Sequence, residues 1–360
     1  MIEPLSHIRA MSPYALSQMN APDGKTLMSL SQNESLRPPS PLAIAAATHA
    51  LQNSALYPDP DWRDLRLALA QLHNIDADGI VCGNGSLDLI GNLARIYSGP
   101  ARAALVPAHA YPFFKTASQM ANARIDCAEE TDATVSVDHL LGAVQPDTAI
   151  VFVANPGNPT GTRIPLSELQ RLRAGLPHSV LLVIDEAYGE FADTLDERAF
   201  DFVESGNTVV LRTFSKAYGM AGFRVGWGLF PNGIATQLNK VMNPNNIAAA
   251  SQAAAVAALS DQDYMHETCA LTASLRQAVT RDLEGLGLRV YQSFTNFVLI
   301  DMGSVAAAEH MDRELQREGI FLRSQTGAGL AHCLRMTIGP QHILDASIAI
   351  VRELQGERQI

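Results

Sequence analysis

The sequence is poor in cysteine, and it contains no long apolar run. Its four cysteines are widely spaced and show neither a CxxC pair nor a Cys/His ligand pattern, so we expect small buried thiols in a reducing cytoplasm and no metal site. No window reaches the roughly 18 consecutive apolar residues typical of a membrane-spanning helix. The first residues also lack the charged and apolar regions of a secretory signal, which favours a cytoplasmic protein.

Positive charge is scarce as well. The chain has 26 Lys and Arg residues against 37 Asp and Glu residues, a formal net charge of −11 at pH 7. A surface of this sign repels nucleic acids and anionic membranes, so neither is expected as a partner. A local basic pocket for a small anion is still compatible with the composition. The arginines within residues 212–224 and 323–335 are candidates for such a pocket.

Length and pattern predict two domains. A chain of 360 residues exceeds the size at which a single core usually stops growing. Residues 1–40 are polar and interrupted by proline, and we expect an irregular arm there. Residues 41–245 alternate helical patterns with short apolar runs, which predicts a large α/β domain. Residues 246–360 begin with a helix-rich stretch and continue with strand patterns, which predicts a small α+β domain with an antiparallel sheet.

Five short apolar runs are the expected strands of the large domain. Runs such as AIVFVA and VLLVI do not alternate with polar residues, which is typical of parallel strands that are covered by helices on both faces. The five runs are residues 103–107, 148–156, 179–188, 207–215 and 224–230. Ligands of open parallel sheets bind beyond the carboxyl ends of the strands. Polar residues follow three of these runs, so we expect a ligand site there.

A glycine-rich turn, CGNGSLDLI, precedes a helical pattern. Such a turn offers an anion the backbone N–H groups and the positive end of the helix dipole. Gly85 and Ser86 stand at the predicted helix start and would bind that anion. A plain glycine turn with a capping Asn or Ser, which needs no ligand, fits the same letters.

Asp185, Tyr188 and Asn158 follow two of the predicted strands. A carboxylate at the end of a buried strand is costly without a partner, and a cationic ring nitrogen would be a suitable partner for Asp185. Tyr188, and the amide of Asn158 in the turn NPGNPTG, are placed to donate to an oxygen of the same ring. The alternatives are an Asp that caps a helix and a structural Asn–Pro turn. Glu186 is expected at the surface.

Lys216 lies in the segment RTFSKAYGMAGFRVGW. Burial and the nearby Arg224 both disfavour an ammonium group, so we expect a lowered pKa for Lys216 and a neutral amine that can form an imine with an aldehyde. Arg224, Thr213 and Ser215 offer donors to a phosphate. An aldehyde, a ring nitrogen, a ring oxygen and a phosphate together describe pyridoxal 5′-phosphate, which is the predicted cofactor.

For three other residues, the sequence is compatible with two interpretations. Tyr111, in HAYPFF, can cover the face of a flat ring or can be an ordinary core aromatic. Arg335 and Arg323 lie among apolar residues, where an arginine needs an anion. That anion can be a structural carboxylate, or it can be the carboxylate or phosphate of a substrate.

These segments together resemble the class I/II aminotransferases of pyridoxal-phosphate fold type I, and within them most closely the histidinol-phosphate aminotransferases. The matching segments are GNGSLDLI, AYPFF, NPGNPTG, VIDEAYGEF, TFSKAYGMAGFRVGW and CLRMTIG. They occur in the family's order, and the lysine segment is the most specific of them. The arm departs from the family, because LSQNESLRP stands where Leu-Asn-x-Asn-Glu-Asn-Pro is usual, with Ser31, Ser35 and Leu36 at the altered places.

The resemblance implies a fold and a set of roles. The fold is a large, mostly parallel sheet flanked by helices, with a smaller α+β domain. Lys216 would bond to the cofactor and shuttle the substrate proton, and Asp185 would keep the ring nitrogen protonated. The remaining cofactor residues would be Asn158 and Tyr188 at the ring oxygen, Tyr111 on the ring, and Gly85, Ser86, Thr213, Ser215 and Arg224 at the phosphate.

The same resemblance implies how substrate and subunits meet. Tyr57 would reach into the neighbouring subunit's site, so a homodimer with shared active sites is expected. Arg335 would receive the anionic end of the substrate, with Arg323 as a second candidate. Asn33 belongs to the arm that helps to close over the substrate.

The expected reaction is transamination. An amino donor, either histidinol phosphate-like or an amino acid, would give its amino group to a 2-oxo acid such as 2-oxoglutarate. A decarboxylase of the threonine-phosphate type is the alternative, as is an aminotransferase for aromatic or other amino acids, because the cofactor residues do not separate these reactions. A cofactor-binding transcription regulator would need a DNA-binding module that the chain has no room for. A plain α/β scaffold would make every polar residue at the strand ends incidental.

Overall fold

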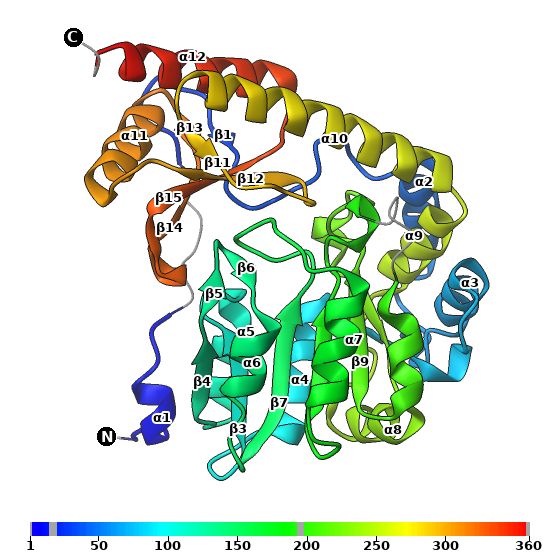
Figure 1. The fold of residues 1–360 in the computed structure, drawn as a ribbon. Coiled ribbons are helices and arrows are strands. Elements are labelled where there is room, and N and C mark those ends of the chain that lie inside the picture. Colours follow the sequence, from blue (N-terminus) through cyan, green and yellow to red (C-terminus); the bar gives the residue numbers. More distant parts are fainter. Residues whose placement is uncertain (1, 14–19, 193–197, 358–360) are drawn as a thin grey trace.

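A seven-stranded mixed sheet forms the centre of the larger part of the molecule (Figure 1). The structure is a computed structural model, and it describes residues 2–13, 20–192 and 198–357. In spatial order the strands of this sheet are β2 (Ile80–Gly83), β10 (Gly226–Leu229), β9 (Thr208–Thr213), β8 (Leu181–Asp185), β7 (Thr148–Ala154), β3 (Ala103–Pro107) and β4 (Ile125–Ala128). Neighbours from β9 to β4 are parallel, whereas β10 is antiparallel to β2 and β9. The mostly parallel sheet is confirmed, and its central strands are buried on both faces.

Helices cover both faces of this sheet. On one face α4 (Ser86–Tyr97) packs against α5 (Pro112–Met120) and α8 (Asn232–Val241). The other face carries α6 (Val137–Gly142), α7 (Leu166–Gly175) and the short 3-10 helix η5 (Ala199–Ser205). The two groups lie on opposite faces because crossover connections between parallel strands are right-handed.

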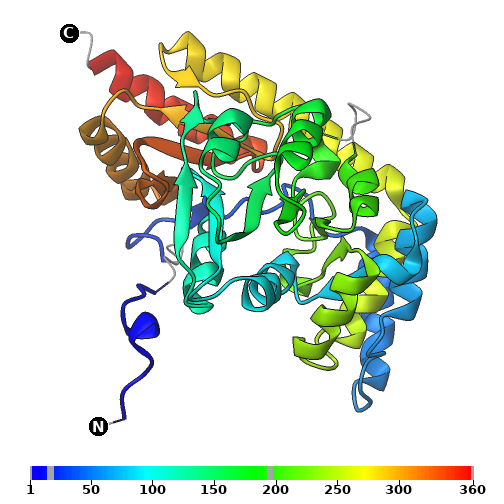
Figure 2. The same ribbon diagram turned by 60° about the horizontal axis from the view of Figure 1, so that its bottom comes forward.

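A second layer of helices lies beside the sheet. The helix α2 (Pro41–Ala50) starts at Ser40, whose hydroxyl accepts a hydrogen bond from the backbone N–H of Ala43 at 3.2 Å. It packs on α9 (Ala249–Leu259), which also contacts α3 (Arg63–His73). From there the long α10 (Gln262–Gly285) runs to the small sheet, as Figures 1 and 2 both show.

The small sheet has four strands in the order β11 (Arg289–Val290), β12 (Phe297–Asp301), β15 (Leu330–Thr337) and β14 (Arg323–Gln325). Every neighbouring pair is antiparallel. Together with α10, α11 (Val305–Arg317) and α12 (Gln341–Glu357), it encloses a separate hydrophobic cluster. The domain boundaries at residues 40 and 245 stay a prediction. Among the described residues, no helix has the length and apolar character needed to cross a bilayer.

The N-terminal arm is more ordered than its composition indicates. Its β1 (Met28–Ser29) pairs in parallel with β13 (Ile320–Phe321), and the backbone N–H of Leu30 donates to the carbonyl of Phe321 at 2.9 Å. Leu30 is fully buried in the cluster of the small sheet. The chain then crosses to α2 (Figure 1). A docked apolar residue, rather than local propensity, thus fixes the segment that precedes α2.

Candidate active site

One pocket of about 480 Å³ lies where the carboxyl ends of the large sheet face the small sheet. It brings together residues from the arm, both sheets and the loops after β7, β8 and β9. The predicted residues that line it are Asn33, Ser86, Tyr111, Asn158, Asp185, Tyr188, Thr213, Ser215, Lys216, Arg224, Arg323 and Arg335. Of the predicted site residues, only Gly85 and Tyr57 are not in its lining.

Lys216 follows β9 and points its amine at the arm. Its Nζ donates to the carbonyl oxygens of Asn33 at 2.9 Å and Gln32 at 3.3 Å. Burial by the surrounding protein and, to a smaller extent, the positive charge of Arg335 lower the pKa of Lys216 to about 7, while Glu34 opposes the shift. The lowered pKa was expected, but Arg335 contributes more to it than Arg224, the residue close in sequence.

Asp185 ends β8 and is only 4% exposed. Its Oδ1 accepts a hydrogen bond from the backbone N–H of Ala187 at 3.1 Å. Burial raises the pKa of Asp185 to about 7; the Ala187 N–H opposes this, the carboxylate of Glu186 adds to it, and Lys216 counteracts it. A cation placed beside this buried carboxyl group would favour its ionised form.

Tyr188 and Asn158 lie within hydrogen-bonding distance of each other. The Tyr188 hydroxyl accepts from Nδ2 of Asn158 at 3.4 Å, and it also accepts from Nδ2 of Asn33 at 2.8 Å. The Nζ atom of Lys216 lies 5.8 Å from the centre of the tyrosine ring. Three hydrogen-bonding groups from three distant parts of the chain therefore surround the space beside the reactive amine.

The glycine turn and the loop after β9 form a cradle for an anion. Gly85, with a φ of 77°, is the residue before α4, and Ser86 begins that helix. Thr213 donates through Oγ1 to the hydroxyl oxygen of Ser215 at 3.0 Å, and Arg224 donates through Nη1 to the same oxygen at 3.3 Å. Hydroxyl groups, a guanidinium and a helix N-terminus thus converge on one end of the pocket.

The cradle has no room for extra side-chain atoms. A Cβ at Gly85 would lie 2.3 Å from Nη2 of Arg224, and a Cβ at Gly226 would lie 2.2 Å from the backbone nitrogen of Ser86. Gly226 pairs with Gly83 on one side and with Thr213 on the other, so β10 joins the two cradle loops. A phosphate, a protonatable ring nitrogen and an aldehyde fit this set of donors, the buried Asp185 and the amine of Lys216.

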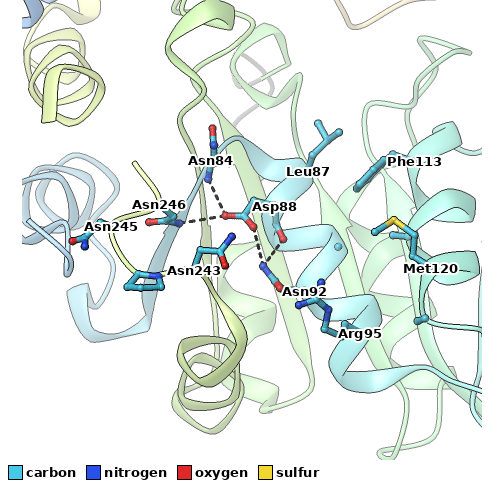
Figure 3. A pocket seen from close by; sticks show the side chains of 14 residues that line it. Asn84, Leu87, Asp88, Asn92, Arg95, Phe113, Met120, Asn243, Asn245 and Asn246 are labelled. Atoms are coloured by element: carbon cyan, nitrogen blue, oxygen red, sulfur yellow. Dashed lines mark hydrogen bonds between the residues drawn. The ribbon is translucent and has the colours of Figure 1, made fainter. Parts of the chain in front are cut away.

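Asp88, in the first turn of α4, stabilises the glycine turn through hydrogen bonds (Figure 3). Its Oδ2 accepts from the backbone N–H of Asn84 at 3.1 Å and from Nδ2 of Asn246 at 3.3 Å, and its Oδ1 accepts from Nδ2 of Asn92 at 2.9 Å. A second pocket, of about 540 Å³, lies on this side of α4. Asp88 was not among the predicted site residues, although an acidic residue in the first turn of a helix is a recognisable signal.

Tyr111 and Tyr57 take different positions. Tyr111 lines the pocket just before α5, and its ring meets that of Phe114 edge to face, with centroids 5.7 Å apart. Tyr57 is 87% exposed in the single chain and does not line its own pocket. A role for Tyr57 at this site would therefore need a second subunit.

Arg335 and Arg323 lie opposite each other in the small sheet, as Cα partners of β15 and β14. Arg335 is buried, and it donates through Nη1 to Oδ1 of Asn158 at 2.6 Å and through Nη2 to the carbonyl oxygen of Ser31 at 2.6 Å. Two guanidinium groups thus face the pocket from the side opposite the cradle.

The arm contributes more than the sequence predicts. Asn33, with a φ of 55°, accepts through Oδ1 from the hydroxyl of Thr337 at 3.2 Å and donates its backbone N–H to the same hydroxyl at 3.0 Å. Asn296 donates through Nδ2 to the carbonyls of Asn33 at 3.1 Å and Glu34 at 3.0 Å. Asn296 was missed, and its only sequence signal is an amide directly before a predicted strand.

Two expectations about charged residues are wrong. Glu186 is 4% exposed instead of lying at the surface, because it pairs with Arg212 through an Oε2–Nη2 distance of 2.9 Å. Arg212 consequently does not join Arg224 in the anion pocket. Neighbouring strand residues point to opposite faces of a sheet, which separates Arg212 from Thr213. In addition, Cys127 is exposed, although buried thiols were expected.

Comparisons with known proteins agree with this geometry. The sequence profile of the family described as Aminotransferase class I and II matches residues 25–347. A histidinol-phosphate aminotransferase of Paramagnetospirillum magneticum is 39% identical over 98% of each chain. The crystal structure of histidinol-phosphate aminotransferase from Sinorhizobium meliloti in complex with pyridoxal-5′-phosphate superposes with a TM-score of 0.91 at 30% identity, over 99% of each chain. An aspartate aminotransferase of Thermus thermophilus, 20% identical with a TM-score of 0.83 over 98% of this chain and 100% of that one, shares the fold.

A buried carboxyl group, a lysine and an anion cradle at the carboxyl ends of a mostly parallel sheet define a pyridoxal-phosphate enzyme of fold type I. The chain belongs to the class I and II aminotransferases, and it is a pyridoxal-phosphate-dependent aminotransferase. The predicted fold class, cofactor and reaction type are confirmed, and transamination is favoured over decarboxylation.

Proposed function

We propose that this aminotransferase takes the amino group of histidinol phosphate, or of a closely similar phosphorylated amine, and gives it to a 2-oxo acid such as 2-oxoglutarate. The observation that carries the proposal is the pair Arg323 and Arg335, which face the pocket of Lys216 from opposite positions on two paired strands. Paired guanidinium groups suit a doubly charged phosphate, and the same groups suit a carboxylate of the second substrate. The named activity of the relatives at 36–39% identity supports this choice.

Each predicted residue is given a role in holding the cofactor. Gly85, Ser86, Thr213, Ser215 and Arg224 would bind its phosphate. Asp185 would hold the proton on the ring nitrogen, while Asn158 and Tyr188 donate to the ring oxygen and Tyr111 covers the ring. The bound cofactor supplies an electron sink for the bond that breaks at the substrate's amine-bearing carbon.

Lys216 is the residue that transfers the proton in the proposed reaction. As a neutral amine, Nζ would accept the proton from the amine-bearing carbon of the donor, and as an ammonium group it would later give that proton back. A pKa of about 7 keeps both forms of Lys216 accessible near neutral pH. Asn33 and Arg335 orient the anionic end of the substrate, and the arm excludes water above the amine.

The substrate is tested with purified enzyme that carries its cofactor. Histidinol phosphate and 2-oxoglutarate should yield glutamate, and histidinol without the phosphate should react at least about 100-fold less efficiently, since a charge-assisted pair is lost. Arg335→Met should raise KM for histidinol phosphate while the visible band of bound cofactor remains. Equal efficiency with both donors, or a clear preference for an aromatic amino acid, would overturn the assignment.

We also propose a cytoplasmic homodimer with shared active sites. Exposed apolar side chains gather along α2 and the turn after it, where Leu42, Leu51, Leu56 and Tyr57 are all at least half exposed. Apolar patches of this kind mark subunit interfaces. The exposed thiol of Cys127 fits a reducing compartment.

Shared sites can be tested by mixing two inactive variants. Tyr57→Ala in one chain and Lys216→Ala in the other should each abolish or strongly reduce activity. Unfolding and refolding the two together would create mixed dimers with one intact site, and part of the activity should return. A monomer in sedimentation, or no recovery after mixing, would contradict the proposal.

A further inference from the structure

Arg212 is a fully buried cation that the catalytic cycle does not use. It lies in β9 directly before Thr213, with 0% of its surface exposed. Its guanidinium carbon lies 5.0 Å from the centre of the Phe200 ring, on the face of the sheet that η5 covers. The strand alternates, so Arg212 points away from the cofactor cradle that Thr213 helps to form. A buried charge needs strong compensation, which its neighbours supply.

That compensation comes from the segment that carries Asp185. Both Nε and Nη2 of Arg212 donate to Oε2 of Glu186, at 3.0 and 2.9 Å, and Nη1 lies 3.7 Å from Oε1 of Glu190. Glu186 is the residue after Asp185, and all three side chains are buried. One arginine thus holds two carboxylates immediately behind the predicted partner of the ring nitrogen.

The backbone is shaped to admit this guanidinium. A Cβ at Gly189 would lie 2.9 Å from both Cζ and Nη2 of Arg212, so any larger residue would displace the charge. The backbone N–H of Glu186 donates to the carbonyl of Leu211 at 2.8 Å, which ties the same segment to β9. The ends of β8 and β9, which carry Asp185 and Lys216, are therefore joined at the back of the sheet by charge as well as by pairing.

We propose that Arg212 is a positioning residue that sets the protonation of Asp185, and thereby the grip on the cofactor's ring nitrogen, by balancing the charges of Glu186 and Glu190. The proposal deepens the role assigned to Asp185 above and rests on it. The arginine touches neither cofactor nor substrate. It acts through the carboxylate next to Asp185, whose charge would otherwise disfavour ionisation at the ring partner.

The charged groups around Asp185 determine whether each substitution should raise or lower its pKa. Glu186, on its own segment, raises the pKa of Asp185, and Lys216, on the loop after β9, lowers it. Arg224 and Arg335 face the same pocket from the cradle and from the small sheet. Loss of the Glu186 charge must therefore lower the pKa of Asp185, and loss of the Arg212 charge must raise it.

The test measures cofactor affinity against pH without turnover. Pyridoxamine phosphate is the probe, because it lacks the aldehyde and so cannot bond to Lys216. Binding to the cofactor-free protein should weaken as pH falls and Asp185 takes up its proton. Glu186→Gln should move the midpoint of this pH dependence about one unit lower, and Arg212→Met about one unit higher, as expected for one unit charge within several ångströms.

Further variants distinguish an electrostatic role of Arg212 from a purely structural one. Arg173→Met removes a half-buried arginine that donates to the backbone carbonyls of Leu176, Pro177, Val180 and Asn207, and it should leave the midpoint unchanged. A purely structural role for Arg212 would weaken binding at every pH in both variants without opposite shifts, and this result would overturn the proposal. If Arg212→Met does not fold, an unshifted midpoint in Glu186→Gln would overturn it alone. Asp185→Asn should remove the Asp185 part of the pH dependence and leave only the titration of Lys216 and of the probe's own phosphate. An unchanged curve in this variant would show that the role of Asp185 itself has failed.

Discussion

The Nζ atom of Lys216 lies 2.9 Å from the backbone carbonyl oxygen of Asn33, a residue 183 positions earlier in the chain. The side chain of the same asparagine bonds to Tyr188 of the large-sheet segment and to Thr337 of the small sheet. The reactive amine, the predicted ligand of the ring oxygen and the small sheet therefore meet at one residue of the arm. Substitutions in the arm should therefore affect the reactive amine directly.

Lys216→Ala should remove the covalent attachment of the cofactor. The cradle and Asp185 stay intact in this variant, so pyridoxal phosphate should still bind, but without the visible absorption band of the lysine-bound form. Activity should fall by at least about 10⁴-fold, since the proton carrier is lost. Survival of the lysine-bound band in the variant would show that another amine holds the cofactor.

Covalent capture of pyridoxal phosphate should depend on pH through Lys216. Its pKa is lowered to about 7, so the ammonium form prevails below that pH, and the rate of capture by cofactor-free protein should rise as pH increases through 7. Arg335→Met removes a charge that lowers this pKa, so the midpoint should move upward by about half to one unit. Stopped-flow absorbance measures both curves.

Arg317→Met is the control for that shift. It removes the same charge from an exposed position on α11, where Arg317 pairs with Glu314. Its capture curve should coincide with that of the original protein. A midpoint for Arg335→Met that stays in place or moves downward would contradict the assigned cause.

Gly85→Ala should damage the phosphate cradle. The added Cβ would meet Nη2 of Arg224 at 2.3 Å, and the φ of 77° is strained for alanine. We expect the Kd for pyridoxal phosphate to rise by about 10-fold or more, in line with roughly 1–3 kcal/mol of backbone strain plus a displaced guanidinium. Gly287→Ala has a similar φ of 81° and open space, so it should cost stability but leave the cofactor Kd unchanged. Equal effects of the two substitutions on Kd would refute the cradle argument.

Leu30→Ala should loosen the arm. Leu30 is fully buried in the cluster of the small sheet, and such truncations cost about 2–5 kcal/mol of unfolding free energy. The loss should appear in KM for the amino donor more than in cofactor affinity, because Asn33 follows on the same segment. Leu67→Ala, on the exposed side of α3, is the control and should change neither the unfolding free energy nor the KM for the amino donor. An unchanged KM for Leu30→Ala would show that the arm does not position substrate.

Much of the site could be predicted because its residues stand directly after buried strands. Asp185 and Lys216 follow apolar runs of β8 and β9, and local sequence alone places them at one edge of the sheet. The rest depends on contacts between distant segments. The bond between Asn33 and Thr337 spans 304 positions, and no local pattern encodes it.

Charge placement shows the same limit. Arg212 and Arg224 are close in sequence and look alike as anion ligands, yet only Arg224 reaches the pocket. The face on which a strand residue lies is set by register, and the register of β9 follows from its pairing with β8 and β10. The surroundings of Tyr57 are still harder to predict from the sequence, because the surface that it would contact belongs to a second subunit.

The pairing of Gly226 with both Gly83 and Thr213 also orders events during synthesis. A nascent chain that ends before β10 has both cradle loops but lacks the strand that hydrogen-bonds on both sides between them. Once that strand has left the ribosome, every proposed ligand of the cofactor from a single chain has been made, whereas Arg323 and Arg335 are still to come. The order of translation therefore places the proposed ligands of the cofactor before the proposed residues that select the amino donor.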